Sequence, residues 1–174
     1  MFRQYIESTN VKSETFSIKA LIDNTVSKIK QDFENEDIEL NIQNDIQNLV
    51  IGDSFRIKAV LSQLIGSAII NSIKNCKIAI NVNQNSKILQ FTVQNTCLSI
   101  SKEKLQRINA ELENQDLEIY RELGEGLAFI KHLTHQIKGS LRVTEQSNYI
   151  TFLFEVPIPY KLGSKYEKRK VSKK

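Results

Sequence analysis

A helix start at Gly52-Asp53-Ser54, followed by a regular apolar pattern, constrains the fold of this chain more than any other feature. Asp53 or Ser54 can cap a helix by accepting hydrogen bonds from its first free amides. The segment 56–72 then carries apolar residues at steps of three and four, which form one broad stripe: Ile57, Val60, Leu61, Leu64, Ile65, Ala68 and Ile69. The sequence therefore predicts a helix from Arg56 to Ser72 that packs this stripe on a core.

A polar ridge borders the stripe. Gln63, Ser67 and Asn71 are four residues apart, so they lie above one another along one edge of the predicted helix. A polar ridge beside a buried face can line a pocket. The alternative interpretation is the ordinary solvated edge of a core helix.

The remaining patterns predict helices and strands in separate runs. Three further segments have helical periodicity, and six short segments are typical of strands. The helices are expected at 16–33, 102–112 and 124–137, and the strands at 38–42, 49–51, 78–82, 89–93, 140–143 and 150–156. A charged loop is expected at 113–123. This order indicates an α+β fold, a two-layer α/β sandwich with helices packed on one face of a mixed, mostly antiparallel sheet.

Composition excludes several classes of protein. The 174 residues are 40% hydrophobic and 25% charged, as in an ordinary globular domain. No stretch approaches the roughly 20 apolar residues of a membrane span, and residues 1–10 hold no apolar run typical of a secretory signal. Cys76 and Cys97 match no metal-ligand spacing, which favours free thiols in a reducing, intracellular compartment. With only His132 and His135 present, a multi-histidine metal site is not expected.

The net charge of +4 comes from the end of the chain. Residues 161–174 carry seven Lys or Arg and one acid, Glu167, so the other 160 residues have a net charge of −2. The body is therefore not a basic nucleic-acid binder. A basic terminal run is usually a solvated tail; contact with nucleic acid or a membrane surface is the alternative.

The segment from Gly52 to Ile69 resembles the start of the ATP-binding domain of sensor histidine kinases, a superfamily shared with gyrase, ATP-driven chaperones and mismatch-repair ATPases. The helix of that family reads approximately N-L-x-x-N-A, and its second Asn holds the magnesium ion that bridges the ATP phosphates. Gln63 stands at the first Asn and Ser67 at the second. The resemblance implies ATP and Mg²⁺ as cofactors if the pocket is functional. Ser67 offers one neutral hydroxyl, and the Gln63 amide cannot take a proton from water at neutral pH.

A second resemblance lies at Val93–Ile100, where the family has D-x-G-x-G-I. There the Asp accepts the adenine amino proton, and the glycines let the backbone approach the base. Asn95 replaces the Asp, and Cys97 and Ser99 replace both glycines, so side chains stand where close approach is needed. Cys97 is interpreted as a small half-buried filler rather than a redox sensor, because it has no nearby cysteine or charge partner in sequence.

The third resemblance is Gly124-Glu125-Gly126-Leu127-Ala128, similar to the family's G-L-G-L-A-I, with Gly139 at the later glycine turn. Gly124 and Gly126 would free backbone amides at a helix N-terminus for phosphate oxygens, and Leu127 matches the family's leucine. Glu125 puts a carboxylate where phosphates would arrive. Two glycines before a helix are also compatible with a merely flexible helix start.

The resemblance gives a division of the chain. Residues 16–157 correspond to the ATPase-like domain, residues 1–15 fall where the kinases leave their dimerisation helices, and residues 158–174 form the basic tail. His132 and His135 lie inside the ATPase-like part, so neither corresponds to the phosphorylated histidine. They are expected to be surface or helix-end residues.

Three functional hypotheses remain open. The first is a degenerate histidine-kinase-type ATPase domain that has no catalytic residues and acts as an interaction or structural module with protein partners. The second is a functional ATP-binding domain of a phosphorelay kinase, with its histidine elsewhere. The third is a component of a larger assembly that docks through its basic tail. Since fold does not fix function, the choice depends on the site.

Overall fold

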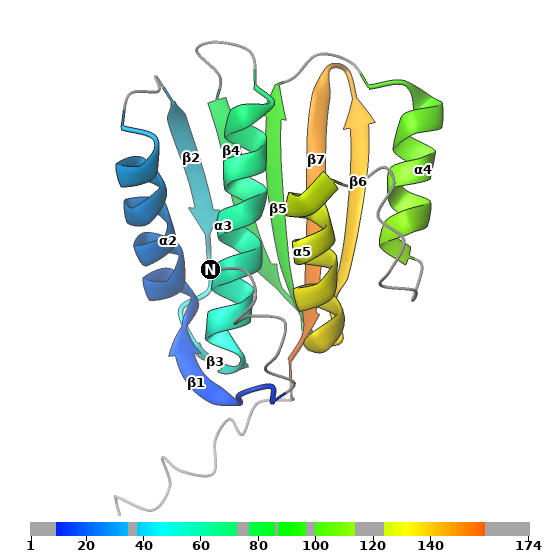
Figure 1. Cartoon of the computed structure of the whole chain (residues 1–174). Coiled ribbons are helices and arrows are strands. Elements are labelled where there is room, and N and C mark those ends of the chain that lie inside the picture. The colour runs from blue at the N-terminus through cyan, green and yellow to red at the C-terminus, as the bar shows by residue number, and fades with distance from the viewer. Residues whose placement is uncertain are drawn as a thin grey trace, which may run out of the picture.

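A five-stranded sheet forms the back of the molecule in a computed structural model that describes residues 10–34, 38–72, 77–85, 87–96, 100–113 and 124–158, without the side chains of 124 and 125. The strand order is β2-β4-β5-β7-β6 (Figure 1). The strands are β2 (Glu39–Asn44), β4 (Lys77–Gln84), β5 (Ile88–Thr96), β6 (Ser140–Gln146) and β7 (Tyr149–Pro157). Only β2 and β4 pair in parallel; the other three pairings are antiparallel.

Alternation along the strands explains which face of the sheet is covered. In β5, buried and half-buried residues alternate over the whole strand, and Leu89, Phe91 and Val93 are fully buried. Phe91 stacks on Phe154 of β7 with ring centroids 5.6 Å apart. A strand with one face on a core is expected to show this period of two.

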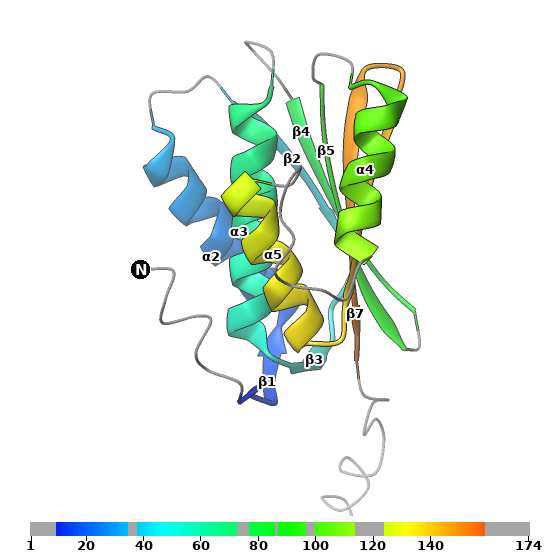
Figure 2. The same ribbon diagram turned by 45° about the vertical axis from the view of Figure 1, so that its right-hand side comes forward.

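Three helices cover that face: α2 (Ile18–Asp32), α3 (Ser54–Ile70) and α5 (Gly124–Gln136). Figure 2 shows them as one layer in front of the sheet, with α4 (Lys102–Glu113) standing beside β6. All seven residues of the apolar stripe predicted on α3 are buried. The expected two-layer α+β fold with a mixed, mostly antiparallel sheet is therefore confirmed.

The N-terminal part differs from the sequence prediction. A helix was expected from Phe16, but residues 14–17 form a strand, β1 (Glu14–Ser17), that pairs antiparallel with β3 (Leu49–Gly52). The helix begins two residues later, at Ile18, where the Ser17 side chain accepts a hydrogen bond from the Ala20 amide. Pairing with a distant strand outweighs local helical periodicity at these two residues.

Both ends of the central helix are also shifted. Asp53 caps α3, so the helix starts at Ser54 rather than Arg56 and ends at Ile70, with Asn71 as its C-cap. The loop expected at 113–123 lies outside the described residues except for Glu113, which ends α4.

Helix α4 covers the edge of the sheet. The Asn109 side-chain nitrogen donates to the Val143 carbonyl at 2.7 Å, and its oxygen accepts from the Val143 amide at 2.9 Å. One side chain thus replaces a strand partner at the outer edge of β6, which blunts an edge that would otherwise offer unpaired backbone groups.

Gly139, in the turn between α5 and β6, is required by the close approach of this turn to β7. A Cβ atom at this position would lie 2.6 Å from the Glu155 carbonyl oxygen of the neighbouring strand. Lys138 before it has φ of 55°, and its amide donates to His135, so the chain leaves α5 through a left-handed residue. The glycine turn expected after this helix is in place.

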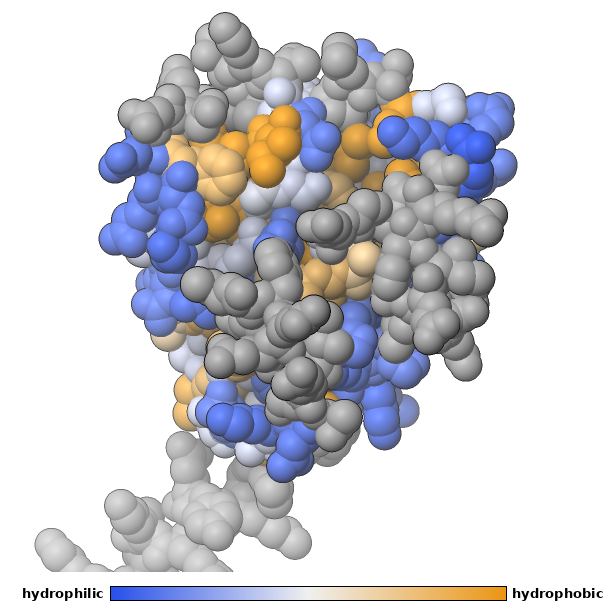
Figure 3. All heavy atoms as spheres, viewed as in Figure 1, coloured by the Kyte–Doolittle hydropathy of each residue, from blue (hydrophilic) through white to orange (hydrophobic). Residues whose placement is uncertain are grey.

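The outer faces of α2 and α4 are mostly hydrophilic, while hydrophobic surface shows near the upper end of α3 (Figure 3). Ile70, the last residue of α3, is 74% exposed. None of the helices formed by the described residues is long and apolar enough to cross a membrane.

Candidate functional site

The first and third sequence matches meet between α3 and α5, which pack against each other. Gln63 is half-buried, and a Cβ atom on Gly126 would lie 3.9 Å from its side-chain oxygen. Gly126 is exposed in the first turn of α5, and Leu127 after it packs partly on the core. The structure therefore places the Gln63 end of the polar ridge beside the glycine-rich helix start.

Further along the ridge, Ser67 and Asn71 contact each other. The Asn71 side-chain nitrogen donates to the Ser67 carbonyl at 2.8 Å and lies 3.4 Å from the Ser67 hydroxyl oxygen. Ser67 is half-buried and Asn71 is exposed at the helix C-cap. The hydroxyl at the family's magnesium position thus faces an amide donor.

Asn95, near the end of β5, joins the strand to the end of α3. It is 1% exposed, and its side-chain nitrogen donates to the Ala68 carbonyl and to the Ser72 hydroxyl, both at 3.0 Å. The Ser72 hydroxyl itself donates to the Ala68 carbonyl at 2.5 Å. Because Ala68 offers only an acceptor there, the Asn95 nitrogen must point toward α3. An aspartate could not donate these bonds.

The other polar side-chain atom of Asn95, Oδ1, is buried and has no hydrogen-bond partner within the part of the chain that the structure describes. A buried unpaired acceptor has a free-energy cost, and such an atom calls for a physical explanation. In this position Oδ1 remains able to accept a hydrogen bond from an amino group, although without the charge of a carboxylate.

The magnesium position is altered in this chain. Ser67 offers a single neutral hydroxyl on a short side chain, where the resemblance implies an Asn amide oxygen as the ligand, and this hydroxyl lies 3.4 Å from the Asn71 side-chain nitrogen. Within the described residues, no group of three His, Cys, Asp or Glu could hold a metal ion.

Two of the predicted site positions, Cys97 and Ser99, lie outside the described residues, and so does the interpretation of Cys97 as a half-buried filler. Gly124 begins α5, and the Glu125 side chain is not described.

Sequence reasoning missed Ser72 as part of this cluster. The pattern showed it only as the last residue of a predicted helix, because its contact with Asn95 joins positions 23 residues apart. A polar residue at a helix end next to a polar strand end is the one signal that pointed to it.

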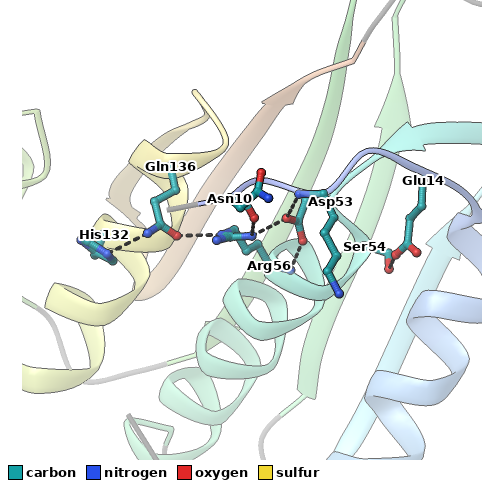
Figure 4. A network of polar contacts seen from close by, with 8 residues as sticks. Asn10, Glu14, Asp53, Ser54, Arg56, His132 and Gln136 are labelled. Carbon is teal, nitrogen blue, oxygen red and sulfur yellow. Dashed lines mark hydrogen bonds and ion pairs between the residues drawn. The ribbon is translucent and has the colours of Figure 1, made fainter. Parts of the chain in front are cut away.

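A second polar cluster lies at the opposite end of α3 (Figure 4). Asp53 and Arg56 form an ion pair at 2.5 Å with side chains 1% and 6% exposed. The Arg56 Nε donates at 2.7 Å to the side-chain oxygen of Gln136 on α5. The i, i+3 charges were visible in the sequence, but the link to Gln136 spans 80 residues and was not.

His132 belongs to this second cluster. Its Nε2 lies 3.0 Å from the Gln136 side-chain nitrogen, one turn away on α5. Arg56 holds the Gln136 oxygen as an acceptor, so the Gln136 nitrogen donates and His132 Nε2 accepts. His132 is half-buried and His135 is exposed in the last turn of the helix.

Comparison with known proteins gives a family match and several similar sequences. Residues 52–160 match the family described as "Histidine kinase-, DNA gyrase B-, and HSP90-like ATPase". The signal transduction histidine-protein kinase BarA of Escherichia coli K12 is 26% identical over 157 residues, which cover 84% of this chain and 17% of BarA. BarA of Shigella flexneri matches equally. The chain thus spans less than a fifth of these curated relatives.

Solved structures show the same fold. The nucleotide-free catalytic domain of histidine kinase ThkA superposes with a TM-score of 0.73 at 22% identity, over 86% of this chain and 99% of that one. Full-length ShkA in complex with AMPPNP gives a TM-score of 0.72 at 16% identity, over 92% of this chain and 34% of ShkA. Together with the match over 52–160, these likenesses place the chain in the histidine kinase-, DNA gyrase B- and HSP90-like ATPase family.

Proposed function

We propose that this chain is a degenerate histidine-kinase-type ATPase domain that acts as a non-catalytic interaction or structural module, with nucleotide binding lost or weak. The observation that carries this proposal is the set of hydrogen bonds made by the Asn95 side chain. The side chain at the adenine-reading position donates its hydrogen bonds to Ala68 and Ser72 and so joins β5 to the end of α3.

The ridge on α3 supports the same conclusion. Ser67 stands at the magnesium position, where a hydroxyl that faces the Asn71 amide replaces the Asn side chain that the resemblance implies. Phosphoryl transfer depends on positioning and on neutralising phosphate charge, largely by magnesium. A site whose described side chains carry no charge is poorly suited to that task.

A protein partner is part of this proposal. Among similar structures, histidine kinase ThkA has been solved in complex with the response regulator protein TrrA; it covers 90% of this chain with a TM-score of 0.68. By analogy we expect this domain to bind other proteins or other modules of a kinase. The division of the chain into residues 1–15, 16–157 and 158–174 is proposed with it, and the basic tail is a candidate for salt-sensitive docking.

A functional ATP-binding domain of a phosphorelay kinase is the second candidate. The Asn95 Oδ1 favours it, since this oxygen has no partner among the described residues and could accept a hydrogen bond from an adenine amino group. The position of Gly126 beside Gln63 favours it as well, because the glycine-rich start of α5 remains next to the ridge.

A nucleotide titration tests the two candidates. Isothermal titration of the chain with ATP, with and without Mg²⁺, should show no saturable binding below about 1 mM, a free energy of about −4 kcal/mol. Binding in the low micromolar range that requires Mg²⁺ would overturn the proposal. Weak binding that is independent of Mg²⁺ would leave an adenine pocket without catalysis, consistent with a degenerate site.

A labelling experiment examines catalysis itself. Incubation with ATP labelled at the γ-phosphate should give no acid-labile phosphate on this chain. His132 Nε2 accepts a hydrogen bond from Gln136, and neither histidine corresponds to the family's phosphorylated one. Acid-labile label on the chain would show that it acts as a kinase on itself.

A further inference from the structure

We propose that the buried Asp53–Arg56 pair couples the N-terminal lead segment, residues 10–14, to helix α5, so that displacing this segment changes the order of α5. Figure 4 shows the contacts, which run from the lead segment through the start of α3 to Gln136 and His132. This inference goes beyond the proposed function and does not depend on nucleotide binding.

Asp53 receives the lead segment. Its Oδ2 accepts from the Lys12 backbone amide at 2.9 Å, and its Oδ1 accepts from the Arg56 amide at 2.9 Å as the cap of α3. The Asp53 side chain is 1% exposed. Because water has little access to this carboxylate, loss of one donor leaves a buried charge less compensated.

Arg56 links Asp53 to helix α5. Its Nη1 donates to Asp53 Oδ2 at 2.5 Å and to the Asn10 carbonyl at 3.4 Å. Its Nε donates to the Gln136 side-chain oxygen at 2.7 Å. The guanidinium is planar and rigid, so a shift on its Asp53 side changes its alignment with Gln136.

A second contact fixes the lead segment to the same helix start. The Ser54 hydroxyl donates to the Glu14 carboxylate of β1. The lead segment therefore meets the first turn of α3 at both its ends, at Asn10 and Lys12 on one side and at Glu14 on the other.

Arg56 contacts helix α5 in the C-terminal half of this helix. Gln136 contacts Arg56 and, one turn earlier, His132. The same helix begins at Gly124 and brings Gly126 beside Gln63. A change at the lead segment would therefore reach a helix that also borders the candidate site.

A proline substitution tests the coupling, because Lys12→Pro removes the backbone N–H that donates to Asp53. The matched control Lys12→Ala keeps that N–H. In the full chain without nucleotide, hydrogen–deuterium exchange would be measured by peptide over α5, with α4 as the internal reference. Lys12→Pro should raise exchange at residues 132–137 by about 3–10-fold, within the range of local opening, and Lys12→Ala should leave it unchanged.

A double variant tests whether the effect on α5 passes through the Arg56–Gln136 contact. In Gln136→Leu, which breaks the contact with Arg56, Lys12→Pro should add no further exchange in α5, since coupled contacts are not additive. Three results would overturn the proposal: no change in α5, an undiminished effect in the Gln136→Leu background, or an equal rise in α4. Because nucleotide is absent, none of them bears on the titration above.

Discussion

Each end of α3 is joined to other parts of the fold by polar side chains, but the two ends use different kinds of groups. At its start, Asp53 and Arg56 are buried charges that satisfy each other and reach Lys12 and Gln136. At its end, the neutral Asn95 is buried and contacts the half-buried Ser72 hydroxyl, and within the described residues the Asn95 Oδ1 has no hydrogen-bond partner. The described contacts place a charged pair at the start of α3 and a neutral amide–hydroxyl contact at its end.

Under the proposal of a degenerate site, this contrast indicates that an altered site residue can still hold the fold together. Asn95 contributes hydrogen bonds between β5 and α3 that a carboxylate at the same position could not donate. Asn95, at the position where the resemblance implies an aspartate, thus joins the end of α3 to the sheet.

The largest effect is expected at the charged end. Arg56→Met should destabilise the chain by about 3–5 kcal/mol, because it leaves the buried Asp53 carboxylate without its cation. Urea denaturation measures this change. The control is Lys19→Met, which breaks the exposed pair with Asp23 and should cost less than about 1 kcal/mol. Equal costs for the two variants would contradict the account of the Asp53–Arg56 pair.

A smaller cost is expected at the neutral end. Asn95→Asp should destabilise the chain by about 1–3 kcal/mol, since a buried carboxylate would face the Ala68 carbonyl without a proton to donate. Thermal or urea unfolding at neutral pH provides the measurement. A variant as stable as the parent would show that the Asn95 amide has no structural role.

Ser72→Ala should have a still smaller effect, about 0.5–1.5 kcal/mol, because Asn95 keeps its bond to Ala68. The matched control, Ser27→Ala, changes an exposed serine on α2 and should stay within about 0.5 kcal/mol. In an Asn95→Leu background the cost of Ser72→Ala should shrink. An unchanged cost there would mean that Ser72 acts independently of Asn95.

The smallest effect is expected for a charge pair away from both ends of α3. The hydrogen bond from Lys77, with its positive charge, lowers the pKa of the Glu39 carboxyl from its usual 4.5. A lowered folded-state pKa gives stability that is present above the unfolded pKa and is lost as pH falls through the folded pKa. Lys77→Met should therefore reduce the loss of stability below pH 4.5 only slightly. A large change in acid stability would contradict the surface position of this pair.

The sequence predicted the architecture well because periodicity records burial. All seven stripe residues of α3 are buried, Asp53 caps the helix, and the alternating segments form strands. β1 was missed, because four residues without clear alternation gain strand structure only from pairing with Leu49–Gly52. Local pattern cannot reveal a partner more than 30 residues away.

The sequence indicated which residues to consider for the candidate site, but not which contacts their side chains make. The loss of an amide at Ser67 and of a charge at Asn95, relative to the family pattern, could be predicted from the sequence, as could the glycine-rich helix start. The hydrogen bonds of Asn95 to Ala68 and Ser72 join segments that are far apart in the sequence. The same is true of the hydrogen bond from Arg56 to Gln136. Such contacts leave no periodic signal.

The most direct test of a degenerate site is to restore the family's residues and measure nucleotide binding. Ser67→Asn, Asn95→Asp, Cys97→Gly and Ser99→Gly would be combined in one variant and titrated with Mg-ATP beside the parent. A charged acceptor at position 95 can contribute about 1.5–3 kcal/mol, roughly 10- to 150-fold in affinity. The account predicts no saturable binding by the parent and measurable binding by the folded quadruple variant. A parent that binds at low micromolar concentration, with no gain from the four changes, would contradict it.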